Sequence, residues 1–61
     1  MKYSEFKRWL EKQGAIFVPH RAGGSHYRVT LNGLSTIFPF HGSKEMGRNL
    51  ENQIKKQLGL K

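Results

Sequence analysis

The dipeptide Asn32-Gly33 stands between two strand-like stretches, and it limits the possible folds of this chain more than any other feature. A two-residue type I′ turn needs positive φ at both central positions, and the pair Asn-Gly is typical of it. The preceding stretch, residues 26–31, alternates polar and apolar side chains as a half-buried strand does. The turn therefore predicts a hairpin with a fixed register. The predicted pairs are Leu31 with Leu34, Thr30 with Ser35, Val29 with Thr36, Arg28 with Ile37, Tyr27 with Phe38 and His26 with Pro39.

The two faces of this hairpin differ in character. Tyr27, Val29 and Leu31 lie on one face with their cross-strand partners and make it apolar. The other face is mostly polar and includes His26 and Arg28, because neighbouring residues of a strand point to opposite sides. We expect the apolar face to be covered and the polar face to remain free.

Two segments have the spacing of amphipathic helices. The first is residues 5–13, with Ser4 as the expected N-cap and Gly14 as the expected C′ residue. The second is residues 48–58, followed by Gly59. Each segment has apolar side chains on a single stripe of the helix. These are Phe6, Trp9 and Leu10 in the first helix and Leu50, Ile54 and Leu58 in the second.

One further strand is predicted at residues 15–18, which are β-branched, aromatic or small and end at Pro19. Residues 20–25 and 39–43 are expected to be loops. The order is then helix, three strands, helix (α-β-β-β-α). This order indicates an α+β fold in which both helices cover one face of a three-stranded antiparallel sheet. We expect residues 1–61 to form a single domain.

The net charge of the chain and its lack of cysteine limit the classes of partner and site that it can have. Eleven Lys and Arg residues against four Glu give a formal net charge of +7, and there is no cysteine. A basic excess spread along the chain favours a polyanionic partner, nucleic acid before a membrane surface. The lack of cysteine excludes disulfides, a thiolate nucleophile and a cysteine zinc site. Without a leader or an apolar run of roughly 20 residues, the expected location is the cytoplasm.

His26 is the strongest candidate for chemistry. It begins a strand directly after Gly24 and Ser25, and Arg28 follows on the same face. Histidine side chains titrate near neutral pH, arginine holds phosphate oxygens in pairs, and glycine lets the main chain approach a phosphate closely. On RNA, a histidine there can remove the proton of a 2′-OH, whose oxygen then attacks the adjacent phosphorus. The alternative, a surface histidine without a role, stays open.

Other residues are weaker candidates. His41 follows the third strand, which the hairpin register brings toward His26; it is either an acid partner, a phosphate contact or a loop histidine without a role. Phe40 is a candidate for stacking on a base. The spacing of the histidines, including His20, matches no metal-ligand pattern, so neither a metal nor another cofactor is predicted. The basic residues expected to contact RNA phosphates are Lys7, Arg8, Arg21, Lys44 and Arg48.

Four stretches of the chain together resemble the HicA toxins of bacterial HicA–HicB toxin–antitoxin systems. They are SEFKRWL at residues 4–10, GSH at 24–26, PFHG at 39–42 and IKKQLGL at 54–60. The resemblance covers nearly the whole chain in matching order. It implies a fold similar to double-stranded-RNA-binding domains, an mRNA interferase activity with His26 as the catalytic histidine, and neutralisation by a HicB antitoxin that covers the face of His26.

The sequence therefore predicts a metal-independent endoribonuclease toxin that cleaves mRNA. Two alternatives remain. One is a non-catalytic module of the double-stranded-RNA-binding type, which shares the order of elements and the charge but needs no histidine. The other is a basic protein associated with the ribosome.

Overall fold

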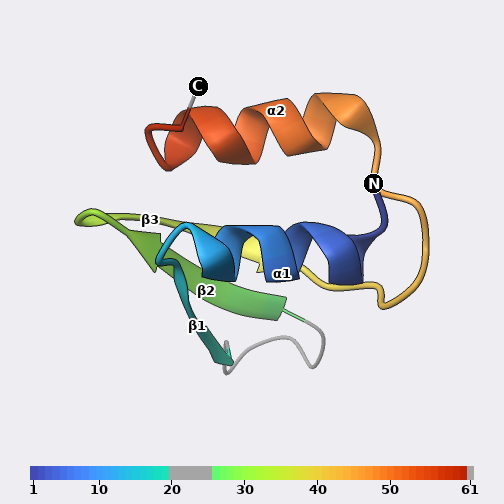
Figure 1. Cartoon of the computed structure of the whole chain (residues 1–61), viewed down its shortest axis with the longest axis horizontal. Coiled ribbons are helices and arrows are strands. Elements are labelled where there is room, and N and C mark those ends of the chain that lie inside the picture. The colour runs from blue at the N-terminus through green and yellow to red at the C-terminus, as the bar shows by residue number, and fades with distance from the viewer. Residues whose placement is uncertain (20–25, 61) are drawn as a thin grey trace.

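The computed structural model describes residues 1–19 and 26–60. Figure 1 shows two helices and a small sheet, in the order helix, three strands, helix that the sequence predicts. Both helices run in the same direction in this view. The elements are α1 (Tyr3–Lys12), β1 (Ile16–Pro19), β2 (His26–Leu31), β3 (Leu34–Pro39) and α2 (Arg48–Gln57).

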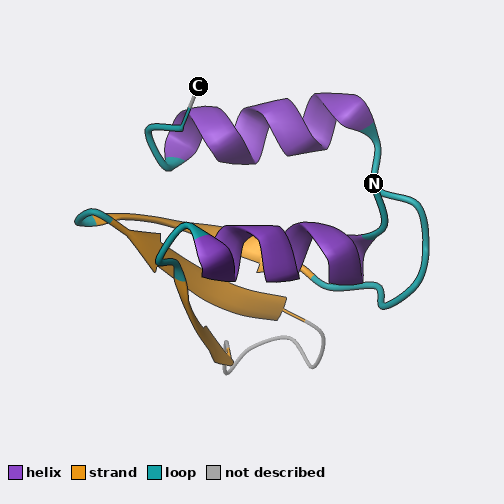
Figure 2. Ribbon diagram, in the orientation of Figure 1, coloured by secondary structure: helices purple, strands orange, loops and turns teal. Residues whose placement is uncertain are grey.

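The sheet has the strand order β1-β2-β3, and both neighbouring pairs are antiparallel (Figure 2). All six cross-strand pairs predicted for the hairpin of β2 and β3 are present. Asn32 and Gly33 have φ angles of 53° and 81°, as a type I′ turn requires. The local turn chemistry has therefore fixed which residues of β2 and β3 share a face.

The core lies between the helices and one face of the sheet. Its strand residues alternate along β2 and β3, so only that face packs against both helices. Trp9, Phe17 and Tyr27, which we expected in the core, are partly buried against it. Leu34 is 46% exposed, because it lies at the tip of the hairpin. The buried apolar residues are Phe6, Leu10, Ala15, Val29, Leu31, Phe38, Met46, Ile54 and Leu58.

Helix α1 begins earlier than predicted, and the prediction that Ser4 is its N-cap is wrong. Lys2 takes that position instead. The main-chain N–H groups of Tyr3 and Ser4 donate to the carbonyl oxygens of Lys44 and Gly42, at 3.0 and 2.9 Å. Because the loop after β3 satisfies these N–H groups, the first turn of the helix does not need a hydroxyl cap.

Both helices end at the predicted glycines. Gly14 and Gly59 have φ angles of 102° and 76°. The N–H of the residue after each glycine donates to a carbonyl five residues earlier, at 3.1 Å for α1 and 2.7 Å for α2. This is the Schellman arrangement, and it turns the chain sharply away from each helix axis.

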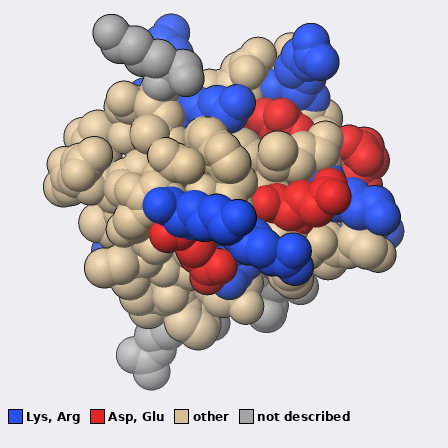
Figure 3. All heavy atoms as spheres, in the orientation of Figure 1, with Lys and Arg blue, Asp and Glu red and all other residues tan. Residues whose placement is uncertain are grey.

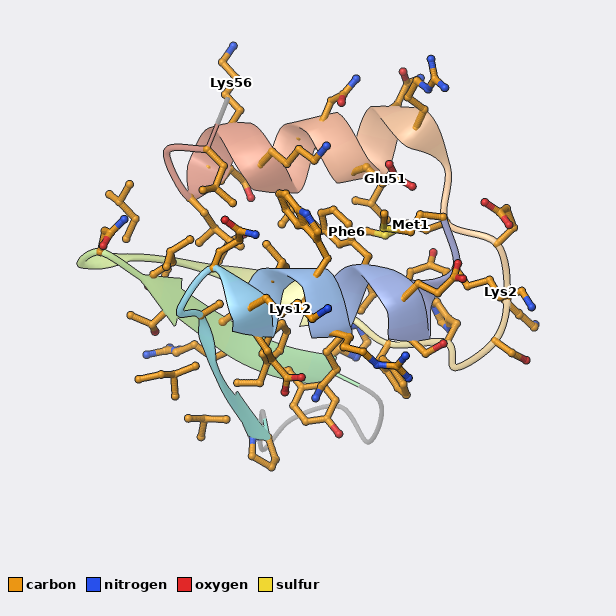
Figure 4. The ribbon with its side chains drawn as sticks, viewed as in Figure 1. Met1, Lys2, Phe6, Lys12, Glu51 and Lys56 are labelled. Carbon is orange, nitrogen blue, oxygen red and sulfur yellow. The ribbon has the colours of Figure 1, made fainter. Side chains whose placement is uncertain are left out.

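The N-terminal residue is tied to the segment that precedes α2. The Met46 N–H donates to the Met1 carbonyl oxygen at 2.9 Å. The α-amino group of Met1 donates to the carboxylate of Glu45. It also lies 3.1 Å from Oε2 of Glu51, and Figure 4 shows the two residues next to each other. Hydrogen bonding to Glu45, and secondly to Glu51, raises the pKa of this amino group above its ordinary value of 8.0. These contacts fasten the start of α1 to the start of α2.

Candidate functional site

One face of the sheet has no helix packed on it in the part of the chain that the structure describes (Figure 1), and we call it the outer face. Its side chains follow from the register of the three strands. The strands contain no acidic residue, since all four glutamates lie in the helices or in the loop before α2. A polyanion bound to the outer face is therefore not repelled by any carboxylate of the strands. Its residues are Ile16 and Val18 from β1, His26, Arg28 and Thr30 from β2, and Ser35, Ile37 and Pro39 from β3.

His26 and Arg28 lie on this face, as predicted. Both side chains are exposed, and neither forms an ion pair within residues 1–19 and 26–60. His26 is the first residue of β2 and lies opposite Pro39. Two residues of a strand span about 7 Å, so one phosphodiester group can lie between the imidazole and the guanidinium. The pair therefore has the spacing needed to hold a phosphate and to move a proton beside it.

The outer face is more apolar than the hairpin pattern alone indicates. Strand β1 adds Ile16 and Val18, which are 64% and 52% exposed, and Ile37 on β3 is 41% exposed. Arg28 lies between Val18 and Ile37 in the same cross-strand row. The methylene groups of an arginine in such a row pack along its apolar neighbours while the guanidinium stays in solvent. The result is one charged group set in an exposed β-branched patch.

His41 lies at the same end of the sheet as His26. Strand β3 ends where β2 begins, so the loop that follows Pro39 starts beside His26. The His41 ring meets the Tyr3 ring edge to face, with centroids 4.8 Å apart and planes at 81°. This contact holds His41 against the first turn of α1, on the helix side of the sheet.

A shallow pocket of about 240 Å³ opens along α1, and we call it the α1 pocket. The Lys7 ammonium lies 3.0 Å from Oε2 of Glu11, and 4.8 and 5.3 Å from the ring centroids of Phe17 and Tyr27. Lys7 is therefore held by an acidic partner and two rings. Arg8 is exposed and has no ion pair within the described ranges. The residues that line the pocket are Ser4, Lys7, Arg8, Glu11 and Phe40.

The remaining sequence candidates are dispersed. Lys44 lies exposed in the loop after β3, and Arg48 lies exposed at the start of α2. Figure 3 shows basic and acidic side chains side by side on the helix side, so this face is not uniformly positive. The candidates Arg21, Gly24 and Ser25 lie outside the described residues, as does His20.

Residues 1–19 and 26–60 contain neither a cluster of metal ligands nor a membrane-spanning helix. No three side chains of His, Cys, Asp or Glu lie close enough together to hold a metal ion in that part of the chain. None of the helices described there has both the length and the apolar character needed to cross a membrane.

Comparison with known proteins gives a consistent result. Residues 3–60 match the family model described as HicA toxin of bacterial toxin-antitoxin. The chain is 61% identical over 61 residues to "Probable mRNA interferase HicA" of Pseudomonas fluorescens (strain Pf0-1), covering 100% of this chain and 98% of that protein. It is 42% identical over 60 residues to "Probable mRNA interferase toxin HicA" of Escherichia coli (strain K12), covering 98% of each. The crystal structure of the E. coli HicAB toxin-antitoxin complex contains a similar chain, with a TM-score of 0.82 and 38% identity over 95% of this chain and 96% of that one.

Proposed function

The chain belongs to the HicA toxin family, and from this premise we propose that it is an mRNA interferase, the toxin of a toxin–antitoxin system. An mRNA interferase is an endoribonuclease that stops translation by cutting mRNA, and we place its action in the cytoplasm. The observation that supports this function most strongly is the match along the full chain to a relative named as an mRNA interferase. The outer face supports the chemistry, because it presents His26 and Arg28 together with no strand carboxylate nearby.

His26 is the catalytic residue in this proposal. Its imidazole takes the proton from a ribose 2′-OH, and the 2′ oxygen forms a bond to the adjacent phosphorus. The bond from phosphorus to the 5′ oxygen of the next nucleotide breaks, and that oxygen receives a proton. The products are a 2′,3′-cyclic phosphate and a 5′-hydroxyl. General acid–base catalysis of this kind contributes roughly 10²–10⁴-fold to the rate.

Arg28 and the loop before β2 hold the phosphate. The guanidinium donates to the two non-bridging oxygens, which gain charge as the new bond forms. In this proposal the main-chain N–H groups of Gly24 and Ser25 also contribute to phosphate binding. The proton for the leaving oxygen comes from His26, which has just received one. No metal ion or other cofactor takes part in the proposed reaction.

Basic residues outside the outer face bind the rest of the RNA by its phosphates. Each such contact releases counterions, so binding weakens as salt is added. Lys7 contributes less than its charge suggests, because Glu11 and two rings already hold its ammonium group. The proposed phosphate contacts are Lys7, Arg8, Arg21, Lys44 and Arg48.

The protein partner in this proposal is a HicB-type antitoxin that covers the outer face. A similar chain has been crystallised in a HicAB toxin-antitoxin complex. The exposed side chains of Ile16, Val18 and Ile37 form an apolar patch that a protein partner can bury. Arg28 within the patch needs an acidic or carbonyl partner once it is covered. An antitoxin bound there would exclude RNA from His26.

A cleavage assay tests the proposed function. The wild-type chain, His26→Gln and the control Ser35→Ala are made by chemical synthesis, because the active protein is expected to harm a producing cell. Ser35 is exposed on the same face as His26 but has no role in the proposal. Each chain is first shown to be folded by circular dichroism and then incubated with a long RNA of defined sequence.

We expect His26→Gln to cut RNA roughly 10²–10⁴-fold more slowly than wild type, and Ser35→Ala to cut at the wild-type rate. Equal rates for wild type and His26→Gln would refute the role of His26. Salt-sensitive binding of duplex RNA without any cleavage products would instead favour a non-catalytic module of the double-stranded-RNA-binding type.

A further inference from the structure

The α1 pocket adjoins the end of the sheet where the proposed reaction takes place. Phe40, in its wall, directly follows Pro39, which pairs with His26. The Phe40 ring also lies 5.9 Å from the ring of Tyr27, the residue after His26. The pocket therefore lies on the helix side and His26 on the outer face, at the same end of the sheet. An RNA strand that passes around this end can contact both.

The wall of the pocket presents the groups that a nucleotide needs. Phe40 offers an aromatic ring, which stacks on any nucleobase. Arg8 offers an exposed guanidinium without an ion pair in the described ranges, and such a group binds phosphate. Glu11 and Ser4 offer oxygen acceptors for the N–H groups of a base edge. The ring of Phe40 thus matches the face of a base, the guanidinium of Arg8 matches a phosphate, and the oxygen acceptors match the edge of the base.

Lys7 organises this pocket in addition to its weaker proposed contact with RNA phosphates. Its ammonium group bonds to Glu11 one helical turn away and lies over two rings of the sheet. The contact fixes the Glu11 carboxylate in the pocket wall and offsets its charge. A nearby phosphate therefore meets the charge of Arg8 with less opposition from the carboxylate.

The size of the pocket distinguishes unpaired from paired nucleotides. Its volume of about 240 Å³ lies below the roughly 300–1,000 Å³ of pockets that enclose drug-sized molecules. It therefore suits one base rather than a stacked pair. In an A-form duplex the base faces are covered by their neighbours, and proteins reach only the edges and the 2′-OH groups. A duplex cannot place a base on Phe40 unless it opens.

We propose that the α1 pocket binds one unpaired nucleotide of the substrate, with its base on Phe40 and its phosphate on Arg8. The substrate class is then single-stranded RNA, or a loop or bulge within a folded RNA. This inference rests on the proposed function for the statement that the bound RNA is a substrate. Binding itself does not depend on cleavage.

The test measures binding to RNA that cannot be cut. An 8-nucleotide RNA of unstructured sequence with 2′-O-methyl groups lacks the attacking hydroxyl, so the wild-type chain can be used. Its fluorescence anisotropy is compared with that of the same strand in a duplex. The variants are Phe40→Leu, Phe40→Tyr and Arg8→Gln. Lys12→Gln is the matched control, since it removes one charge from the far end of the same helix (Figure 4).

We expect Phe40→Leu and Arg8→Gln each to weaken single-strand binding by about tenfold, a mid-range loss for one base–aromatic or phosphate contact. Phe40→Tyr keeps an aromatic ring and should bind within about threefold of wild type. Phe40→Leu should leave duplex binding unchanged. Lys12→Gln should change single-strand binding by less than about threefold, because it removes a charge outside the pocket.

Three results would overturn the inference. One is an equal loss of single-strand and duplex binding in Phe40→Leu. Another is an equal loss of single-strand affinity in Lys12→Gln and Arg8→Gln, which would show that binding depends on the net charge of the chain and not on the pocket. The third is a tenfold loss in Phe40→Tyr as well. If wild type binds as expected but leaves ordinary RNA uncut, the proposed function fails while the pocket stands.

Discussion

Phe38 tests whether the sheet has one packed face and one free face. Its side chain is fully buried, and its ring centroid lies 6.1 Å from that of Phe6 and 5.5 Å from that of Phe17. The preceding residue, Ile37, points to the opposite side of the same strand and is 41% exposed. Two neighbouring residues of β3 therefore probe the two faces separately.

The expected losses follow from burial. Replacing a buried Phe by Ala costs about 3–5 kcal/mol. A chain of this length has a total stability of about 3–9 kcal/mol, at 0.05–0.15 kcal/mol per residue. Phe38→Ala should thus remove a large part of the folding stability, whereas Phe38→Leu should cost about 1–3 kcal/mol. Ile37→Ala should cost about 1 kcal/mol or less, since its side chain packs on few neighbours.

Urea unfolding at 25 °C, followed by the fluorescence of Trp9, measures these differences. The unfolding midpoint should fall strongly in Phe38→Leu and slightly in Ile37→Ala, with the same dependence on urea concentration in both. An equal fall in the two variants would show that the outer face is packed. That result would refute the assignment of the outer face as the free surface.

Further predictions concern the turn, the N-terminus and RNA binding. Gly33→Ala should cost about 1–2 kcal/mol in the same urea assay because φ is 81°, although a Cβ there meets no atom within 4 Å; D-alanine at this position should restore the wild-type midpoint. In the 61-residue chain, acetylating the α-amino group of Met1 should lower the unfolding temperature at pH 7. The raised pKa of that amino group means that its ion-pair contribution is present below pH 8.0 and is lost as the pH rises through the raised value. The acetylated and free chains should therefore converge at alkaline pH, and a difference that is independent of pH would contradict the ion pair with Glu45. For single-stranded RNA, Arg8→Gln should reduce the slope of log affinity against log salt by about 0.7; an unchanged slope would remove Arg8 from the phosphate contacts.

The parts of the fold that depend on local chemistry were predictable from the sequence. Asn32-Gly33 fixed the hairpin register because a type I′ turn leaves no other pairing. Gly14 and Gly59 end their helices for a similarly local reason. The start of α1 was not predictable, because its first N–H groups bond to a loop some forty residues away. The burial of Met46 was missed for the same reason, since a lone apolar residue in a loop shows no periodicity.

The candidate site divides in the same way. The alternation of β2 placed His26 and Arg28 on one face, and the structure has them there. The apolar patch on that face was not predicted, because no tight turn fixes the register of β1 against β2. The α1 pocket was also missed as a unit. Phe40 and Arg8 were separate candidates, and only the packing of the loop after β3 on α1 brings them together.

The central claim is that His26 activates a 2′-OH on the outer face. Mass spectrometry of the RNA ends tests it most directly, with wild type and His26→Gln incubated in EDTA. We predict a 2′,3′-cyclic phosphate, or the phosphate formed when it opens, on one product and a 5′-hydroxyl on the other. Both ends should be nearly absent with His26→Gln. A 3′-hydroxyl with a 5′-phosphate, or the same ends formed at the same rate by His26→Gln, would contradict the claim.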